Sequence, residues 1–424
     1  MLKTLAILFV VLCFLRPTVT AQAQNDTLQV SLPDAEKMFL DSNLLLLAQK
    51  YNVDAQNALI LQAKLLPNPN FSIGHGLYSG TLNQFFPVGS NDETSAQLSQ
   101  LILLAGKRNK QVKLARENQK LSEYQFFDLL RTLKYTLRGD FFNIYYLQES
   151  EKVYDKEIGA LQQVVHAFEQ QEGNGYIAEK EVVRIKAQLY SLQSEYNDLQ
   201  NQENDLQSEL RLLLQVRPTK YITPLADTIS ISNLDPSKYT LNTLLDSAYT
   251  NRTDLLIAQA NTNINSLNYD YQKALAVPDL TLSVGYDEQG SFLTDFYSIG
   301  ASIDLPFFNR NQGNIKSAKA MVDYAAATQK STEATVGENV SRSLQKAYTE
   351  NKLYKNIDSK FEGDFDNLTQ QVLINYEKRN IGLLDFLDFY DSYKQNVLAT
   401  NYLKYSRVQS FEDINFYTGT NFFN

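Results

Sequence analysis

The sequence contains few of the residues that carry metal and redox chemistry. Its 424 residues include one cysteine, two histidines and three methionines, and tryptophan is absent. The cysteine, Cys13, lies inside an N-terminal apolar run, so we expect neither disulfides nor thiol chemistry in the chain that follows. No spacing around His75 or His166 matches a metal site, and no glycine-rich loop could hold phosphate. The sequence therefore predicts no cofactor and no metal site.

Long apolar segments and excess positive charge are also missing. After residue 24 no stretch is apolar for long enough to span a bilayer as a helix, which excludes a helical membrane protein. The formal net charge is −9, and this acidity argues against nucleic acid as a partner.

The first residues have the pattern of a secretory signal. A lysine precedes an apolar run from Leu5 to Leu15, and Ala21 and Ala23 form a small-x-small cleavage site. This run of about 11 residues is shorter than the roughly 20 that a spanning helix needs. We therefore expect residues 1–23 to be a signal peptide, with an N-terminal membrane anchor as the alternative.

The rest of the sequence repeats once. The segment PNPNFSIG at 67–74 aligns with PDLTLSVG at 278–285, and GYIAEKE at 175–181 aligns with RNIGLLD at 379–385. Such self-similarity predicts two copies of one structural unit. The expected organisation is a first repeat at 24–217, a linker at 218–240 and a second repeat at 241–424.

Each repeat contains a segment in which apolar residues alternate with small or polar ones. In the second repeat Leu282 and Val284 alternate with Ser283 and Gly285, and another alternating run follows a polar turn. This period of two predicts β-hairpins, at about 70–104 in the first repeat and about 279–306 in the second.

The remainder of each repeat is predicted to be helical. Proline is absent between Pro87 and Pro218 and after Pro306, and apolar residues there recur at spacings of three and four, the coiled-coil period. Each long helix would span about 100 Å, the length of two shorter helices placed end to end. The long helices are expected at about 107–172 and 312–378, and the shorter ones at about 33–65, 178–216, 241–276 and 383–418.

Four strands per chain would leave two open sheet edges and an uncovered apolar face. In a bilayer only a closed barrel satisfies the backbone, and strands of about 9–11 residues are long enough to cross it. The alternation therefore favours an outer-membrane barrel whose strands come from several chains. The alternative is a periplasmic coiled-coil scaffold without a barrel.

Two segments between a predicted strand and a predicted helix resemble a known family. LSQLILLAGKR at 98–108 and LPFFNRNQGNI at 305–315 are similar to the strand-to-helix junctions of the TolC-like outer-membrane factor family, in particular its heavy-metal branch of CzcC-like and CusC-like ducts. The first segment departs from the Pro-Ile-x-x-Gly-Gly that is usual in that branch. The resemblance covers almost the whole chain after residue 23.

The resemblance implies a mainly α fold with β structure. It implies a homotrimer whose twelve-stranded outer-membrane β-barrel, with four strands from each protomer, continues into a periplasmic tunnel of twelve helices. Such a protein is not an enzyme but the exit duct of a tripartite efflux pump, which passively conducts substrate out of a Gram-negative periplasm. The implied partners are outer-membrane lipid, a periplasmic adaptor and an inner-membrane RND-type pump. The implied cargo is heavy-metal cations, with a multidrug or type I secretion duct as the alternative.

The predicted junctions combine aromatic, proline and polar residues. Pro306 ends strand pairing because it has no N–H donor, and the aromatic rings of Phe307 and Phe308 suit a membrane interface. The polar residues that follow can cap a helix and turn the chain. The candidate junction residues are Gly106, Lys107, Arg108, Pro306, Phe307, Phe308, Asn309, Arg310, Asn311 and Gly313.

The densest candidate site is the predicted helical tip of the second repeat. Asp385 and Asp388 are three residues apart and share a helix face. By the resemblance, they fall where family members carry aspartate rings at the periplasmic constriction. In a trimer each would form a ring of three carboxylates that attracts cations. The alternative is a solvated surface pair.

Three further tip residues are gate candidates by the same resemblance. Tyr376 and Glu181 fall on positions that hold the closed state in the best-known ducts. The tip arginine of the family would fall on Ile381, whereas Arg379 stands in place of the usual turn glycine. We therefore expect either a shifted arginine contact or a weaker lock.

Overall fold

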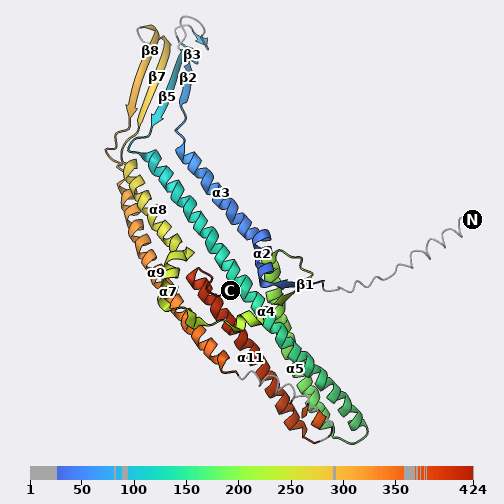
Figure 1. The fold of residues 1–424 in the computed structure, drawn as a ribbon. Coiled ribbons are helices and arrows are strands. Elements are labelled where there is room, and N and C mark those ends of the chain that lie inside the picture. Colours follow the sequence, from blue (N-terminus) through green and yellow to red (C-terminus); the bar gives the residue numbers. More distant parts are fainter. Residues whose placement is uncertain are drawn as a thin grey trace, which may run out of the picture. The chain divides into compact units, whose positions relative to one another are not determined.

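The computed structural model describes residues 26–80, 83–87, 94–289, 293–357, 368, 371–372, 374–376, 378 and 380–423. The predicted signal peptide at 1–23 lies outside these residues. The chain divides into two compact units (Figure 1). Unit 1 comprises Met1–Phe39 and Asp140–Ala226, and unit 2 comprises Leu40–Gly139 and Asp227–Asn424.

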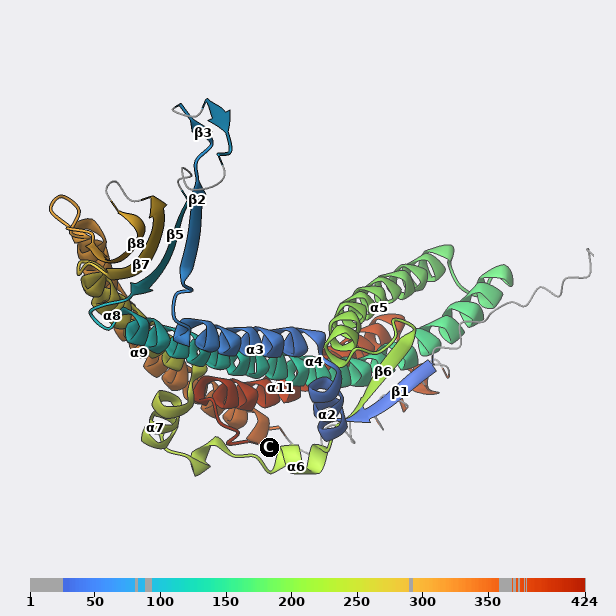
Figure 2. The same ribbon diagram turned by 90° about the horizontal axis from the view of Figure 1, so that it is seen from above.

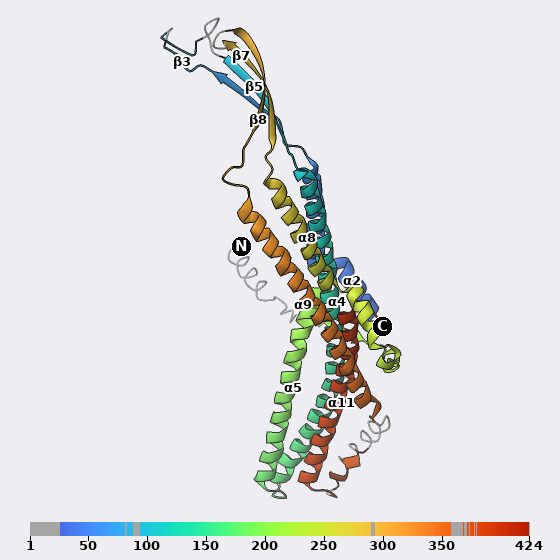
Figure 3. The ribbon, with the colours of Figure 1, turned by 90° about the vertical axis from the view of Figure 1, so that its left-hand side faces the viewer.

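Unit 1 is built on two antiparallel helices, the second half of α4 (Lys107–Gly173) and α5 (Glu179–Leu214) (Figure 3). Buried apolar residues such as Leu161 and Ile185 recur along both helices at spacings of three and four. Strands β1 (Asp26–Ser31) and β6 (Lys220–Leu225) pair in parallel, and β1 runs into helix α2 (Leu32–Ser42).

The helices of unit 2 surround a core beside the C-terminal end of α11. The core cluster combines residues of α7, α8, α9 and α11 with Phe423 near the C-terminus. Helix α8 lies against α9. The remaining helices of unit 2 are α3, α6, a short 3₁₀ helix and the first part of α4, up to Gly139. Their bounds are α3 (Leu44–Lys64), α6 (Thr228–Ser232), η1 (Pro236–Lys238), α7 (Leu241–Asn251), α8 (Thr253–Leu275), α9 (Gln312–Lys355) and α11 (Leu383–Thr418).

Two helices that the sequence predicts as continuous are divided. The break before α3 is at Asn43, whose backbone is extended and whose Oδ1 accepts the N–H groups of Leu45 and Leu46, both at 3.1 Å. The break before α8 is at Arg252, which is also extended. Apolar spacing does not reveal these breaks. At Asn43 the side chain caps the next helix, so one helix ends and another starts there, whereas Arg252 makes no side-chain cap.

Two other predicted segments also differ in detail. Residues 218–240, predicted as a linker, contain β6, α6 and η1. The long helix predicted at about 312–378 is described as α9 only to Lys355, and part of the remainder lies outside the described residues.

A four-stranded antiparallel sheet forms one end of unit 2 (Figures 1 and 2). Its order is β2-β5-β7-β8, so β2 and β8 are open edges within one chain. A small additional hairpin, β3–β4, follows β2. The bounds are β2 (Asn70–His75), β3 (Tyr78–Ser79), β4 (Gln84–Phe85), β5 (Thr94–Ile102), β7 (Leu280–Gln289) and β8 (Thr294–Ile303).

The two faces of this sheet differ in chemistry. Leu98, Val284 and Ile299 lie opposite one another across β5, β7 and β8, and directly paired residues share a face. The other face carries small residues, with Ser283 opposite Gly300. A Cβ on Gly300 would lie 2.7 Å from the Ser283 Oγ, so a larger residue there would require the serine side chain to move. One face is thus apolar and exposed, and the other is lined by glycine and small polar side chains.

Within the described parts of the chain, no helix is both long enough and apolar enough to cross a membrane.

Candidate functional site

The first junction turns the chain between β5 and α4. Ala105 and Gly106 both have left-handed backbone angles, with φ of 53° and 67°, and α4 begins at the next residue, Lys107. Two consecutive left-handed residues reverse the backbone direction sharply, and glycine adopts this conformation without steric cost. Arg108, in the first turn of α4, is half-buried.

A buried ion pair ties this junction to the segment that precedes β7. Lys107 is 4% exposed, and its Nζ donates to the Val277 carbonyl and to Asp279 Oδ1, both at 2.7 Å. The same Asp279 oxygen accepts the Leu104 N–H at 2.9 Å. Burial raises the pKa of the Asp279 carboxyl, but these two hydrogen bonds outweigh that effect and hold the pKa below its usual value. The carboxylate therefore joins segments that are far apart in the sequence.

The second junction, residues 304–311, is held by side-chain amides. Asn309 Oδ1 accepts the Asn311 N–H at 3.0 Å, and Gln312 Oε1 accepts the Arg310 N–H at 2.8 Å. Asn311 has a left-handed φ of 57°, and its Nδ2 donates to the Gln272 carbonyl of α8 at 2.8 Å. The polar side chains thus form hydrogen bonds with backbone groups that have no partner in a strand or helix, and they attach the turn to α8.

The aromatic residues of the second junction point outward. Phe307 is 67% exposed and Phe308 is 97% exposed, whereas Pro306 is half-buried. Gly313 lies in the first turn of α9, where an added Cβ would meet no atom within 4 Å, so nothing in this chain requires glycine there. Two exposed phenylalanines therefore stand in the turn between β8 and α9.

The tip aspartates both lie on the solvent side of α11. Asp385 is in the first turn, Asp388 follows one turn later, and both are exposed. Phe386, between them, is fully buried. In one chain these carboxylates are therefore available to solvent or to a neighbouring molecule. Across the described residues, no group of three or more His, Cys, Asp or Glu side chains is arranged to hold a metal ion.

The gate candidates have different surroundings. Tyr376 is only 8% exposed, and its ring stacks on Phe386 with a centroid distance of 4.3 Å. Glu181, in the first turn of α5, is half-buried and belongs to unit 1. Arg379 lies outside the described residues. Sequence reasoning missed the Tyr376–Phe386 stack and the Lys107–Asp279 pair, because neither contact has a local spacing signal.

Comparisons with known proteins identify the fold and a relative. The profile of the outer membrane efflux protein family matches residues 37–215 and 244–420. The cobalt-zinc-cadmium resistance protein CzcC of Cupriavidus metallidurans is 22% identical over 298 residues, which are 70% of this chain and 68% of that protein.

Solved structures of outer membrane channels share this architecture. The Campylobacter jejuni CmeC channel matches with a TM-score of 0.74 at 16% identity, over 92% of this chain and 86% of that one. CusC matches with a TM-score of 0.72 at 16% identity, over 92% of each chain. The open state of Neisseria gonorrhoeae MtrE gives 0.69 at 17% identity, over 92% and 89%. The mainly helical fold with a small sheet is therefore that of outer membrane efflux channels.

Proposed function

Because this chain belongs to the outer membrane efflux protein family, we propose that it is the exit duct of a tripartite efflux pump for heavy-metal cations. The protein lies in the outer membrane of a Gram-negative bacterium, with its helical part in the periplasm. The likeness to a cobalt-zinc-cadmium resistance protein is the observation that supports the cargo. The family and the fold are those of channels, so the proposed role is passive conduction without catalysis.

The proposed working form is a homotrimer. One chain supplies four strands, leaves β2 and β8 as open edges and exposes an apolar face. Open edges cannot be satisfied in lipid, whereas three copies could close a twelve-stranded barrel above a tunnel of twelve helices. The apolar face would then contact lipid and the glycine- and serine-lined face would line the pore. A detergent-solubilised protein with the mass of a folded monomer or dimer would contradict this assembly.

The proposed partners are a periplasmic adaptor and an inner-membrane RND-type pump, which supply the energy that a passive duct lacks. In this role the Asp385 and Asp388 carboxylates form cation-attracting rings at the periplasmic end. Their exposure in the single chain supports this placement, since it leaves them free to face an axis. Glu181, Tyr376 and Arg379 remain the proposed gate residues.

A deletion strain tests the cargo. Sensitivity to zinc, cadmium and cobalt salts and to a panel of hydrophobic drugs is measured side by side, with the wild-type gene restored as the control. We expect increased metal sensitivity with little change for the drugs. Increased drug sensitivity alone would instead identify a multidrug duct of the same fold, and failure to secrete a protein would identify a secretion duct.

A further inference from the structure

The helical residues next to the sheet carry a charge opposite to that of the whole chain. The formal net charge of the chain is −9, yet the segment 107–120 at the start of α4 contains six lysines and arginines and one acid. The segment 310–322, at the start of α9, adds three cations and no acid. Helix α4 follows β5 and α9 follows β8 (Figure 1). Positive charge therefore collects where the helices meet the sheet.

This chain supplies few counter-charges for the start of α4. Lys107 is paired with Asp279. Glu117 is the one acid of the segment, and its Oε2 is buried without a hydrogen-bond partner among the described residues. Four further cations, which we call the basic segment, have no ion pair or side-chain hydrogen bond within the described part of the chain: Arg108, Lys110, Lys113 and Arg116.

Other charges at this level of the molecule are paired or distant. On α8, Asp270 pairs with Lys273 at 2.8 Å, and on α9, Asp323 pairs with Lys319 at 3.1 Å. Asp304 is exposed just after β8, and β7 separates β8 from β5 in the sheet. The acids of these neighbouring elements therefore do not neutralise the basic segment.

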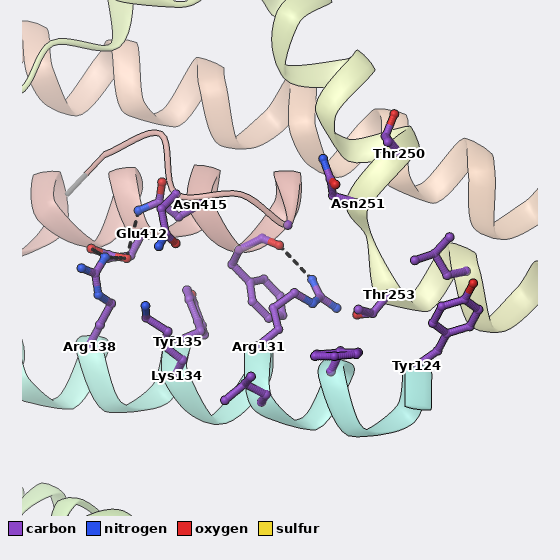
Figure 4. Close-up of a pocket in the computed structure, with 16 residues that line it drawn as sticks. Tyr124, Arg131, Lys134, Tyr135, Arg138, Thr250, Asn251, Thr253, Glu412 and Asn415 are labelled. Carbon is purple, nitrogen blue, oxygen red and sulfur yellow. Dashed lines mark hydrogen bonds and ion pairs between the residues drawn. The ribbon is translucent and has the colours of Figure 1, made fainter. Parts of the chain in front are cut away.

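Cations farther along α4 are neutralised within the chain. Arg131 pairs with Asp128 at 2.7 Å. Arg138 donates to both oxygens of Glu412, at 2.8 and 2.9 Å (Figure 4). Unpaired cations are thus not a general property of this helix but a feature of the end beside the sheet. This difference indicates that the counter-charge of the basic segment lies outside the chain.

Part of the basic segment is open to an external partner. Gln111 Nε2 donates to the Tyr271 hydroxyl of α8 at 2.7 Å, so this side of α4 packs on α8. Lys113, Arg116 and Lys120 follow one another at spacings of three and four on another side of the helix, and all three are exposed.

The basic segment begins close to the end of a predicted membrane strand. Strand β5 ends at Ile102 and α4 begins at Lys107. At 1.5 Å per residue, Lys110 and Lys113 lie about 5 and 9 Å along α4. The headgroup layer of a bilayer is roughly 5–8 Å deep on each side. Side chains of a helix tilt toward its N-terminus, which here is the sheet end. In the proposed barrel these two ammonium groups therefore reach the headgroup layer.

We propose that the basic segment binds the phosphate groups of anionic phospholipids in the membrane leaflet that faces the periplasm. The proposal rests on the proposed barrel, which places the end of β5 at the membrane surface. Lysine and arginine clusters directly beside a membrane span attract anionic headgroups, and their N–H groups donate to phosphate. The same cations in the pore would instead oppose the proposed cation cargo.

The absence of tryptophan from the chain allows a local test. Ile102→Trp places the only tryptophan at the end of β5, at a side chain that is 37% exposed. The assembled full-length protein is reconstituted into phosphatidylethanolamine vesicles that contain either phosphatidylglycerol or phosphatidylcholine with brominated acyl chains, which quench a nearby tryptophan. Quenching as a function of the mole fraction of each lipid gives their relative binding constants.

Three double variants in this background separate charge from fold. Lys110→Gln with Lys113→Gln removes two charges of the basic segment, and Lys110→Arg with Lys113→Arg keeps both charges. Lys330→Gln with Lys352→Gln removes two exposed lysines of α9 that lie far from the sheet along the helix. The yield of heat-modifiable protein shows that each variant folds.

We expect phosphatidylglycerol to bind about fivefold more tightly than phosphatidylcholine at 0.1 M salt. The glutamine pair at 110 and 113 should reduce this preference to about twofold or less, whereas the arginine pair and the α9 pair should keep it. Without any change to the basic segment, the preference should fade near 1 M salt, where the Debye length is about 3 Å.

Equal binding of the two lipids at low salt would overturn the proposal. So would a preference that survives high salt, or that the glutamine pair retains. A glutamine pair that alters ion selectivity in planar bilayers but not lipid preference would place the basic segment in the pore and overturn the proposal as well. Absence of quenching by either lipid would overturn the proposed barrel too, so failure of the barrel and failure of the lipid preference are distinguishable.

Discussion

At the first junction a single carboxylate connects two segments that are far apart in the sequence. Asp279 accepts hydrogen bonds from the Lys107 side chain and from the Leu104 backbone, and Lys107 also holds the Val277 carbonyl. Because Lys107 is 4% exposed, its charge has little access to water and depends on these partners. The position of α4 relative to β7 therefore depends on this pair.

Asp279→Asn should destabilise unit 2. The change leaves a buried ammonium without its counter-charge, which we expect to cost about 2–4 kcal/mol. The thermal unfolding midpoint of the purified protein measures the effect. Asp270→Asn is the matched control, because it breaks the exposed Lys273–Asp270 pair of α8 and should change the midpoint little. Equal shifts for both variants would show that Lys107 does not depend on Asp279.

Unit 1 contains a buried carboxyl of a different kind. Asp140 is 7% exposed, and its Oδ2 has no hydrogen-bond partner among the described residues. Burial raises the pKa of the Asp140 carboxyl to about 8, and the charge of Glu209 adds to the shift. The folded unit therefore keeps this group protonated at neutral pH.

The raised pKa of Asp140 predicts a pH-dependent stability. The folded state binds this proton more tightly than the unfolded state, so the free energy of unfolding falls as pH rises from about 4 to about 8. Asp140→Asn removes the ionisation and should be more stable than wild type at pH 8.5, by a few kcal/mol at most, with a smaller difference at pH 5. Urea unfolding at both pH values measures this. Asp198→Asn, an exposed position on α5, is the control and should give the same small difference at each pH.

At the scale of elements, the sheet separates two chemistries by register. Val284 pairs with Leu98 and Ile299, whereas its neighbour Ser283 pairs with Ser99 and Gly300. Successive residues of a strand point to opposite faces of the sheet. Val284 therefore lies on the apolar face, and its neighbour Ser283 lies on the face with small polar side chains.

Substitutions on the two faces should therefore differ in effect. If the apolar face contacts lipid, Val284→Arg should cost about 2–4 kcal/mol near the bilayer midplane. Ser283→Arg should be milder, because residue 283, opposite Gly300, would then face the water-filled pore of the proposed barrel. The yield of heat-modifiable, folded protein extracted from outer membranes measures the difference. Equal losses for the two variants would contradict the assignment of the faces.

At the scale of the whole molecule, the proposed function depends on copies that meet around an axis. The tip carboxylates Asp385 and Asp388 are exposed and belong to one helix, so a single chain cannot form a ring. Three copies would bring six carboxylates together, and their combined potential would favour cations.

The double change Asp385→Asn with Asp388→Asn should lower cation preference in planar bilayers. The effect should be clear at 0.1 M salt, where the Debye length is about 10 Å, and should fade near 1 M, where it is about 3 Å. Tyr376→Phe is the matched control for gating, because it keeps the ring that stacks on Phe386 and removes only the hydroxyl. It should raise resting conductance with less effect on ion preference. Wild-type cation preference in the double variant at low salt would identify the aspartates as a solvated surface pair.

The sequence by itself determined the features that depend on neighbouring residues. The alternation around Leu282 and Val284 indicated strands because side chains of a strand alternate with a period of two. Spacings of three and four indicated helices that pack as pairs, and the segment at 305–315 indicated a turn held by its own polar side chains. These signals are local, and together with the resemblance they led to the channel family that the comparisons confirm.

Only the tertiary structure decided which distant residues meet. The Lys107–Asp279 pair and the burial of Tyr376 against Phe386 have no local spacing. The buried ion pair between Arg138 of α4 and Glu412 of α11 likewise joins distant segments. Such contacts arise because packing brings segments together according to the shape of the whole unit, and that shape is not encoded in any single stretch of sequence.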